Sequence, residues 1–430
     1  MADREEVDLL IEPHWLMPMA GSAAVLTGEA VAVSGGRIVA LGPAAALRER
    51  CAPRQQVQRP HHVLLPGFVS ACTQAAQVLL RGATGAARRA SLRIDPLGGP
   101  PATQAADFVR DGVRLAMAEM LGAGITCFAD LSLQPEEVAR AVAAGPMRAC
   151  VGLPVAEAPS AWADGVTAYL ARAARLWDEY RSDARISLFF APLGGAALSE
   201  QTLGRVRRVA DELEARIALT LRAPEEELVR DAPRLRGATP LEHLAQLGLL
   251  RPGSAVCAAE GLGAEDLERL AHAGAALVLG PRAALAAGAA RLPPSLPALT
   301  ALGCETPVVG ALDILEEART AALLGIAPGE ALRLATLGGA TALGLQAQVG
   351  SIEPGKVADL VCIDLSALAA RRQPDVPQAL LFGATRSEVC DVWCAGRAAL
   401  SEGRLLAFDA GELAQLLARW TQRLKLEVAA

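Results

Sequence analysis

Apolar residues follow two different patterns along this chain of 430 residues. In the first sixty-odd residues, short apolar or alternating runs are separated by turns at Gly35-Gly36 and Gly42-Pro43, which is typical of β-strands joined by hairpins. Residues 350–363 and 389–397 return to this pattern near the other end of the chain. The pattern therefore predicts strands at both ends, and those near the N-terminus cover Val7–Ile11, Ala30–Val33 and Arg37–Leu41.

Between about residues 66 and 345, short apolar runs alternate with segments of helical spacing. A helix over 111–123, for example, is followed by a strand-like run over 124–130. Helix and strand alternate again at Glu200–Leu213 and Ile217–Leu221, and at Leu241–Leu249 and Ala255–Ala258. This alternation implies a parallel sheet with crossover helices, and by itself it leaves open whether the sheet closes into a (β/α)₈ barrel.

Composition narrows the class of protein. Apolar residues make up 52% and charged residues 20% of the chain, as expected for a globular protein with a large core. The net charge of −6 argues against nucleic acid and anionic membranes as partners. No apolar run approaches the roughly 18 residues of a membrane span, and the acidic N-terminus lacks the pattern of a secretory signal. We therefore expect a cytoplasmic protein.

The cysteines indicate the same compartment. Nine are present, none of them in a CxxC pair, and most stand in apolar, strand-like runs. They are interpreted as small buried hydrophobic residues in a reducing cytoplasm.

The segment LLPGFVSACTQAA, at 64–76, is similar to the PGFVNAHTHAA motif that ends the first barrel strand in the amidohydrolase superfamily. The resemblance is to the branch of methylthioadenosine/S-adenosylhomocysteine deaminases and TRZ/ATZ-like chlorohydrolases, and it extends to residues 108–112, 335–344 and 350–360. It implies a (β/α)₈ TIM-like barrel with a small β-sandwich built from both termini, and a homodimer. The expected domains are 1–65 plus 348–430, the sandwich with a C-terminal helix, and 66–347, the barrel.

The resemblance also implies where a catalytic metal would bind. In this branch two histidines after strand 1, one after strand 5 and an aspartate after strand 8 hold the metal, while a glutamate and a histidine after strands 5 and 6 move protons. The corresponding positions of this chain hold Cys72, Gln74, Thr220, Ala223 and Ala258. The aspartate-bearing motif GTDGAASNN is expected to be deleted, because Val309-Gly310-Ala311 runs straight into Leu312-Asp313, and Asp313 matches a later helical aspartate.

Positions that the resemblance assigns to substrate contact differ as well. Leu193 and Leu279 stand at the strand-4 and strand-7 motifs that contain histidines in the branch, and the lid over 83–104 contains no aromatic residue. A zinc site of three or four protein ligands cannot be assembled from one cysteine, one glutamine and one threonine. We therefore expect that the protein binds neither a metal nor another cofactor. The vestigial site positions are then Cys72, Gln74, Leu193, Thr220, Ala223, Ala258 and Leu279.

The five histidines are interpreted as structural. His61-His62 precedes the strand that enters the barrel, and adjacent residues on a strand point to opposite faces. His14, His243 and His272 are assigned to a terminal strand and outer helices.

Three residues remain as alternatives for chemistry at the barrel mouth. The Cys72 thiol would be a nucleophile if a cation such as Arg222 lowered its pKa, but we interpret it as an inert buried thiol. Asp130 and Glu260 are candidates for acid–base work or for capping loops, and we favour capping.

Two functional hypotheses follow. The first is a degenerate amidohydrolase homologue, a pseudoenzyme that acts by binding a small molecule or by associating with a protein. The alternative is a hydrolase of a non-peptide C–N bond, in a purine- or amide-like substrate, that uses Cys72 or the carboxylates in place of the inherited mechanism.

Overall fold

The structure is a computed structural model that describes residues 4–82, 101–221, 235, 237–257, 262–286, 292, 295–305, 307–308, 310–366 and 375–428. The chain divides into two compact units, one with residues 1–70, 118–127 and 313–410, the other with 71–117, 128–312 and 411–430. The expected domain boundaries stay a prediction, and each unit is described by itself.

The first unit contains a sheet built from both ends of the chain. Its order is β17-β16-β15-β14-β5-β1-β3-β4, with β2 paired to β1. Strand β14 pairs antiparallel with β5, so the C-terminal strands continue the N-terminal ones. Leu9, Ile11 and Trp393 are among the side chains of its core. The strands are β1 (Glu5–Leu16), β2 (Leu26–Thr27), β3 (Glu29–Ser34), β4 (Arg37–Pro43), β5 (Cys51–Pro66), β14 (Leu360–Asp364), β15 (Val389–Cys394), β16 (Arg397–Ser401) and β17 (Arg404–Leu405).

The helices of this unit are α1 (Ala44–Arg50), α11 (Ile314–Leu323), α12 (Pro328–Arg333), α13 (Gly339–Ala342) and α15 (Val376–Gly383). Asp313 caps α11, because its Oδ1 accepts the backbone N–H groups of Leu315 at 3.0 Å and Glu316 at 3.2 Å. This cap explains why an aspartate precedes the helix, and it agrees with leaving Asp313 out of the metal site.

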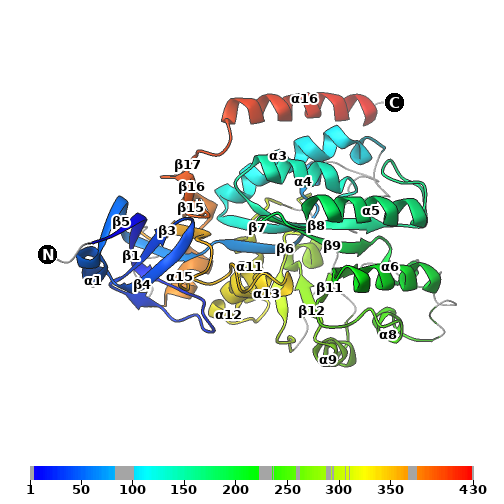
Figure 1. The fold of residues 1–430 in the computed structure, drawn as a ribbon, viewed down its shortest axis with the longest axis horizontal. Helices are drawn as coiled ribbons and strands as arrows, with labels where there is room; N and C mark the ends of the chain where they lie inside the picture. Colours follow the sequence, from blue (N-terminus) through cyan, green and yellow to red (C-terminus); the bar gives the residue numbers. More distant parts are fainter. Residues whose placement is uncertain are drawn as a thin grey trace. The chain divides into compact units, whose positions relative to one another are not determined.

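The second sheet has eight strands in the order β6 to β13, so that strands adjacent in sequence are adjacent in space. The helices between them pack on the sheet, as α4, α5 and α6 do on β8 and β9 (Figure 1). The strands are β6 (Phe68–Thr73), β7 (Ile125–Asp130), β8 (Arg148–Val155), β9 (Ile186–Pro192), β10 (Arg216–Thr220), β11 (Ser254–Cys257), β12 (Ala276–Leu279) and β13 (Thr300–Leu302). The helices are α3 (Ala106–Gly122), α4 (Pro135–Ala144), α5 (Val166–Tyr180), α6 (Glu200–Glu212), α8 (Pro240–Gln246), α9 (Ala264–Ala273) and α10 (Pro281–Ala286).

The two edge strands of this sheet meet at their carboxyl ends. The backbone N–H of Gln74, just after β6, donates to the carbonyl of Glu305, just after β13, at 2.9 Å. A Cβ added to Gly303 would lie 2.8 Å from the backbone N and O of Cys72. The predicted (β/α)₈ barrel is therefore confirmed, with a sheet that is nearly closed between β13 and β6.

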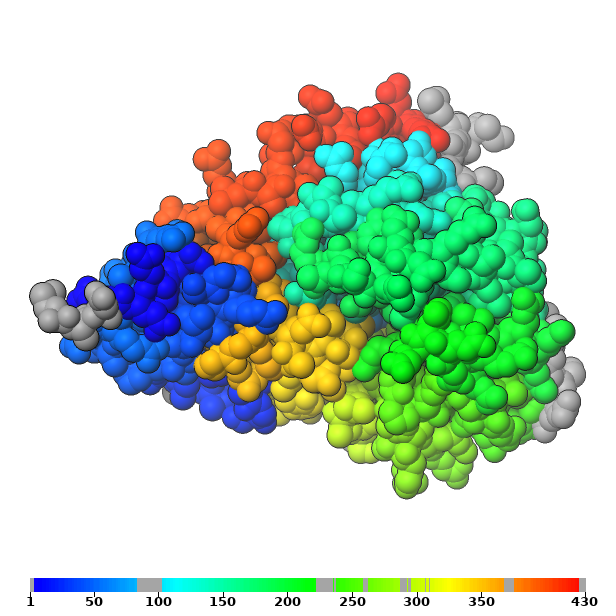
Figure 2. All heavy atoms as spheres, viewed as in Figure 1, coloured from blue at the N-terminus to red at the C-terminus, as the bar shows by residue number. Residues whose placement is uncertain are grey.

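The C-terminal helix α16 (Ala410–Val428) packs beside α3, where it forms part of the surface (Figures 1 and 2). Trp420 is 1% exposed and stacks edge-on against Phe108, with the ring centroids 5.3 Å apart. Its indole N–H donates to Asp111 at 3.0 Å. Among the described residues, none of the helices combines the length and apolar character that crossing a bilayer requires.

Candidate functional site

The carboxyl ends of the barrel strands bring together residues from distant parts of the sequence. In a (β/α)₈ barrel this end is where catalytic and binding groups collect. Cys72, the fifth residue of β6, has 0% of its surface exposed, and Gln74 has 1%. Glu305, after β13, is also 1% exposed. The backbone contact between Gln74 and Glu305 holds these three residues at one place on the barrel.

The expected deletion after the eighth strand is not found, and that prediction is wrong. The eighth strand is β13, which ends at Leu302, and α11 begins only at Ile314; the described residues between them, 303–305, 307–308 and 310–313, belong to a loop. The apolar run that ends at Ala311 resembles a strand, but Gly310 and Ala311 lie in this loop. Two arginines hold the loop, since Arg81 donates to the carbonyl of Gly310 at 3.1 Å and Arg282 to that of Ala311 at 2.7 Å.

Glu305 is a candidate site residue that the sequence interpretation missed. Gly303-Cys304-Glu305 stands directly after the short strand, where the related motif reads GTD, so Glu305 replaces an aspartate with a carboxylate one methylene longer. A Cβ on Gly280 would lie 2.3 Å from Cδ of Glu305, so the glycine leaves the space that the carboxyl group occupies. The three-residue length of β13 obscured this signal.

Asp130, the last residue of β7, has a structural role. One carboxylate oxygen accepts the backbone N–H of Ala75 and the other that of Ser132, both at 2.8 Å. Burial raises the pKa of Asp130, and hydrogen bonds from Ser132 and Ala75 oppose the shift. The carboxylate therefore fixes the turn that follows Gln74, which favours the capping interpretation.

The remaining predicted positions are spread around the mouth. Leu193, after β9, and Thr220, the end of β10, are half-buried, and Leu279, the end of β12, is 0% exposed. A Cβ on Gly195 would lie 2.3 Å from the carbonyl oxygen of Thr220, so the loop after β9 touches the end of β10. Four further candidates lie outside the described residues, namely Ala223, Ala258, Arg222 and Glu260.

None of the five histidines stands at the carboxyl end of a barrel strand. His14 and His272 are exposed and His243 is buried in α8. His61 is exposed while His62 is half-buried, as expected for neighbours on one strand.

The donor groups at the mouth are a thiol, an amide, a hydroxyl and a carboxylate. The amide of Gln74 forms no hydrogen bond with any residue that the structure describes. Zinc sites take three or four ligands from cysteine, histidine and carboxylate side chains. At the described strand ends the side chains of these types are Cys72, Asp130, Cys257, Cys304 and Glu305, and Asp130 is already bonded to backbone N–H groups. Among the described residues, a single group of three such side chains has its ligand atoms within 4.8 Å of one another: Cys362, Cys390 and Asp391, in the terminal sheet.

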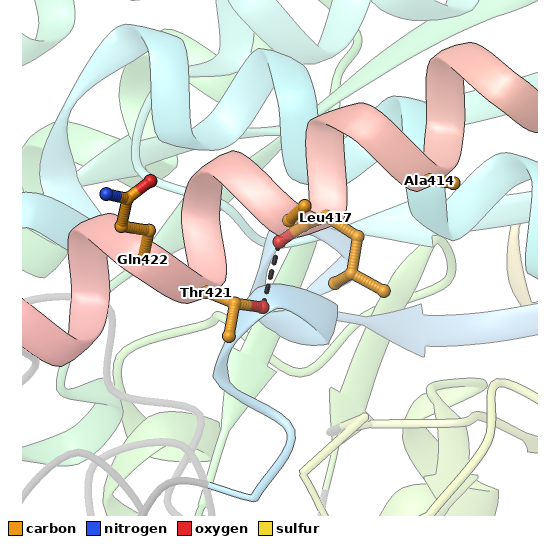
Figure 3. A pocket seen from close by; sticks show the side chains of 5 residues that line it. Ala414, Leu417, Thr421 and Gln422 are labelled. Carbon is orange, nitrogen blue, oxygen red and sulfur yellow. Dashed lines mark hydrogen bonds between the residues drawn. The ribbon is translucent and has the colours of Figure 1, made fainter.

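A hollow on α16 is a second concave feature. Ala414, Leu417, Ala418, Thr421 and Gln422 line it (Figure 3). The Thr421 hydroxyl donates to the carbonyl of Leu417 at 2.8 Å, within the helix itself. These side chains include no titratable group, so the hollow offers no acid–base or nucleophilic chemistry.

Comparisons with known proteins find similar sequences and structures. The sequence model of the amidohydrolase family matches residues 63–399, and that of a bacterial imidazolonepropionase-like composite domain matches 30–50. A 5-methylthioadenosine/S-adenosylhomocysteine deaminase of Teredinibacter turnerae is 31% identical, with 99% of each chain covered, and one of Saccharophagus degradans is 28% identical, with 100% of this chain and 99% of the relative covered.

Two solved structures extend the comparison. An adenosine deaminase from Xanthomonas campestris with bound zinc is 34% identical, with a TM-score of 0.89 over 99% of this chain and 100% of that one. The atrazine chlorohydrolase TrzN from Arthrobacter aurescens, 18% identical, has a TM-score of 0.83 over 96% and 99%, which shows a shared fold.

Proposed function

This chain belongs to the amidohydrolase family, and on that premise we propose that it hydrolyses a C–N bond of a small purine- or amide-like molecule at the mouth of the β6–β13 barrel. The observation that carries the proposal is Glu305, a buried carboxylate after β13 whose backbone bonds to the segment after β6. The deaminases that resemble this chain over nearly its whole length support the class of reaction.

The chemistry assigned to Glu305 is that of a general base. A carboxylate in a buried site can accept a proton from a water molecule as the water oxygen attacks the carbon of the C–N bond. The nitrogen then leaves as ammonia or an amine after taking up a proton, so the reaction consumes one water. The Cys72 thiol, which is buried near the end of β6, is the second group that the proposal assigns to this site.

No step is assigned to a metal. Among the described residues, no three cysteine, histidine or carboxylate side chains of the mouth have their ligand atoms within 4.8 Å of one another, and Gln74 and Thr220 stand where the family resemblance implies imidazoles. The donor set does not fit a zinc ion. It supports the proposal that this member of the family lost the inherited metal site.

The test is ammonia release from 5-methylthioadenosine, S-adenosylhomocysteine and adenosine by the purified full chain. We expect Glu305→Gln to lower kcat/KM by about 100-fold or more, because it removes the base and keeps the size of the side chain. Glu330→Gln is the matched control, since Glu330 lies on α12 and pairs with Arg333 at 2.6 Å. Equal loss in both variants, or none in Glu305→Gln, would contradict the role of Glu305.

A second candidate function is binding without turnover. One argument for it is that Cys72, Gln74 and Thr220 stand where the resemblance implies metal-binding histidines. Another is that the Asp130 carboxylate is already bonded to two backbone N–H groups. The discriminating result is saturable binding of the same nucleosides, measured by calorimetry, with no ammonia released by the unmodified protein. That result would replace the hydrolase proposal with this one.

A further inference from the structure

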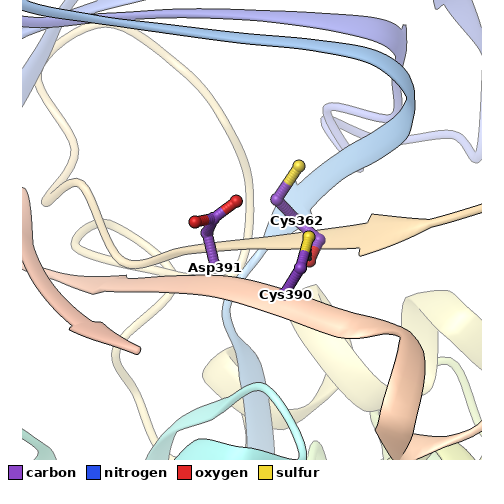
Figure 4. Close-up of side chains that lie close together, drawn as sticks. All are labelled: Cys362, Cys390 and Asp391. Carbon is purple, nitrogen blue, oxygen red and sulfur yellow. Dashed lines mark hydrogen bonds between the residues drawn. The ribbon is translucent and has the colours of Figure 1, made fainter. Parts of the chain in front are cut away.

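Two cysteines of the terminal sheet lie together because of an irregularity in its pairing. Strands β14 and β15 are antiparallel, with Cys362 opposite Asp391 and Ile363 opposite Val389. The register shifts between these two pairs, so Cys390 is the extra residue of a β-bulge. As a result, the sulfur atoms of Cys362 and Cys390 lie within 4.8 Å of each other and of the Asp391 carboxylate (Figure 4).

Cys390 is the more accessible member of the pair. It is half-buried, whereas the other eight cysteines of the chain are buried, and all nine are free thiols. Its Sγ donates to the carbonyl oxygen of Cys362 at 3.2 Å, so the thiol already points at the neighbouring strand.

Charged groups surround this thiol from the neighbouring strands. On β15, Asp391 forms a two-pronged ion pair with Arg59 of β5, with N–O distances of 2.7 and 3.0 Å. Also on β5, His62 has its Nδ1 3.9 Å from Asp364 of β14, and this buried nitrogen forms no hydrogen bond with a described residue. Arg59 also lies 3.7 Å from Glu402, so the charged groups around Cys390 are Arg59 and His62 on one side and Asp391, Asp364 and Glu402 on the other.

The thiols titrate differently as a consequence. The side chain of Cys362, as a hydrogen-bond donor to the thiolate, lowers the pKa of Cys390 to about 7; burial opposes this shift and His62 aids it. Burial, together with the neighbouring Cys390, raises the pKa of Cys362 well above its usual value. Burial alone would lower the pKa of His62, but the neighbouring Cys390 and Asp364 raise it above its ordinary value. A thiolate beside a cation is the reactive form of cysteine.

A metal ion is a less suitable occupant of this cluster. Asp391 is 1% exposed, and besides Arg59 it accepts the backbone N–H of Glu402 at 3.2 Å. A carboxylate with these partners would have to give up an ion pair to bind a metal. That leaves two thiols, which is fewer than the three or four ligands of a protein zinc site.

We propose that Cys390 and Cys362 form a peroxide-reactive dithiol, in which Cys390 attacks the oxidant and Cys362 closes a disulfide between β15 and β14. In the first step the Cys390 sulfur takes one peroxide oxygen as a sulfenic acid, and the other leaves as water with the thiol proton. In the second, the Cys362 sulfur attacks the sulfenic sulfur, and its proton and the hydroxyl leave as water. One peroxide is reduced to two waters and two thiols become one disulfide.

The test uses the full-length reduced protein and hydrogen peroxide. Peptide mass spectrometry without reductant should identify a Cys362–Cys390 cross-link as the first disulfide formed. In Cys362→Ser, Cys390 should instead accumulate as a sulfenic acid that dimedone traps. Cys394→Ser is the matched control, because Cys394 is a buried cysteine on the same strand and should leave the cross-link unchanged.

Alkylation of the native protein gives a second, independent readout. Iodoacetamide should modify Cys390 at least tenfold faster than any other cysteine at pH 7, and its rate should rise with pH around a midpoint near 7. His62→Gln should shift that midpoint upward. Absence of the Cys362–Cys390 cross-link, alkylation of Cys390 no faster than of the buried cysteines, or a stoichiometric metal ion that blocks both thiols would overturn the proposal.

Discussion

The carboxyl group of Glu305 has room only because residue 280 is a glycine, which has no side chain. Because a Cβ at position 280 would lie 2.3 Å from Cδ of Glu305, Gly280→Ala should displace the carboxyl group and destabilise the protein by about 1–3 kcal/mol. Urea unfolding measures this loss. In the Glu305→Ala background the obstacle is gone, so the same substitution should cost much less. Equal cost in both backgrounds would show that Gly280 serves some purpose other than making room for Glu305.

Asp391 should make the stability of the protein depend on pH in acid. Burial would raise its pKa, but the hydrogen bond from Arg59 and the N–H of Glu402 lower it below the ordinary value. A depressed folded-state pKa stabilises the fold above the unfolded pKa, and this contribution is lost as the pH falls below about 4. Asp391→Asn should therefore cost about 3 kcal/mol near pH 7.

The difference in stability between the wild type and Asp391→Asn should shrink as the pH is lowered from 6 towards 2. Thermal unfolding across this range measures it. A difference that stays constant with pH would show that the Arg59–Asp391 pair does not carry the effect.

At the scale of elements, α16 is joined to α3 by one buried aromatic residue. Trp420 contacts Phe108 and donates to Asp111, and Asp111 also accepts from Arg419 at 2.7 Å. Trp420→Ala should destabilise the protein by about 3–5 kcal/mol, because it leaves a cavity and removes one of the hydrogen bonds to Asp111. Leu417, on the same helix, is 44% exposed, so Leu417→Ala should change the stability by no more than about 0.5 kcal/mol. Denaturant unfolding of both variants tests whether α16 is held by this contact.

At the scale of the whole molecule, the metal content tests the proposal that the inherited site is lost. After expression in medium supplemented with zinc and manganese, mass spectrometry should find less than about a tenth of an equivalent per chain. Chelation should accordingly leave the melting temperature unchanged. Nearly one equivalent that is still bound in Cys362→Ser would contradict the proposal that the inherited site is lost.

The oligomeric state is the second property at this scale. We expect a homodimer, on the family resemblance, so light scattering should give about twice the chain mass of 44.5 kDa. A mass of one chain at micromolar concentration would contradict the expectation.

The sequence by itself determined the architecture, because its signals are local. Alternation of apolar runs with helical segments indicated a parallel sheet, and strand-like runs at both ends indicated a second sheet. Motifs such as 64–76 and 350–360 indicated the family through short stretches of neighbouring residues. The types of side chain at Cys72, Gln74 and Thr220 could likewise be assigned from local alignment.

Only the tertiary structure decided what depends on residues far apart in the sequence. The two edge strands of the barrel meet through the contact between Gln74 and Glu305. The same contact identifies Glu305 as a residue of the mouth, which could not be recognised from the sequence because β13 is only three residues long. The short distance between the sulfur atoms of Cys362 and Cys390 depends on a bulge between two strands, and no pattern in the sequence predicted this bulge. Local patterns record how each segment buries its own apolar face, whereas a site depends on which segments meet, and packing of the whole chain decides that.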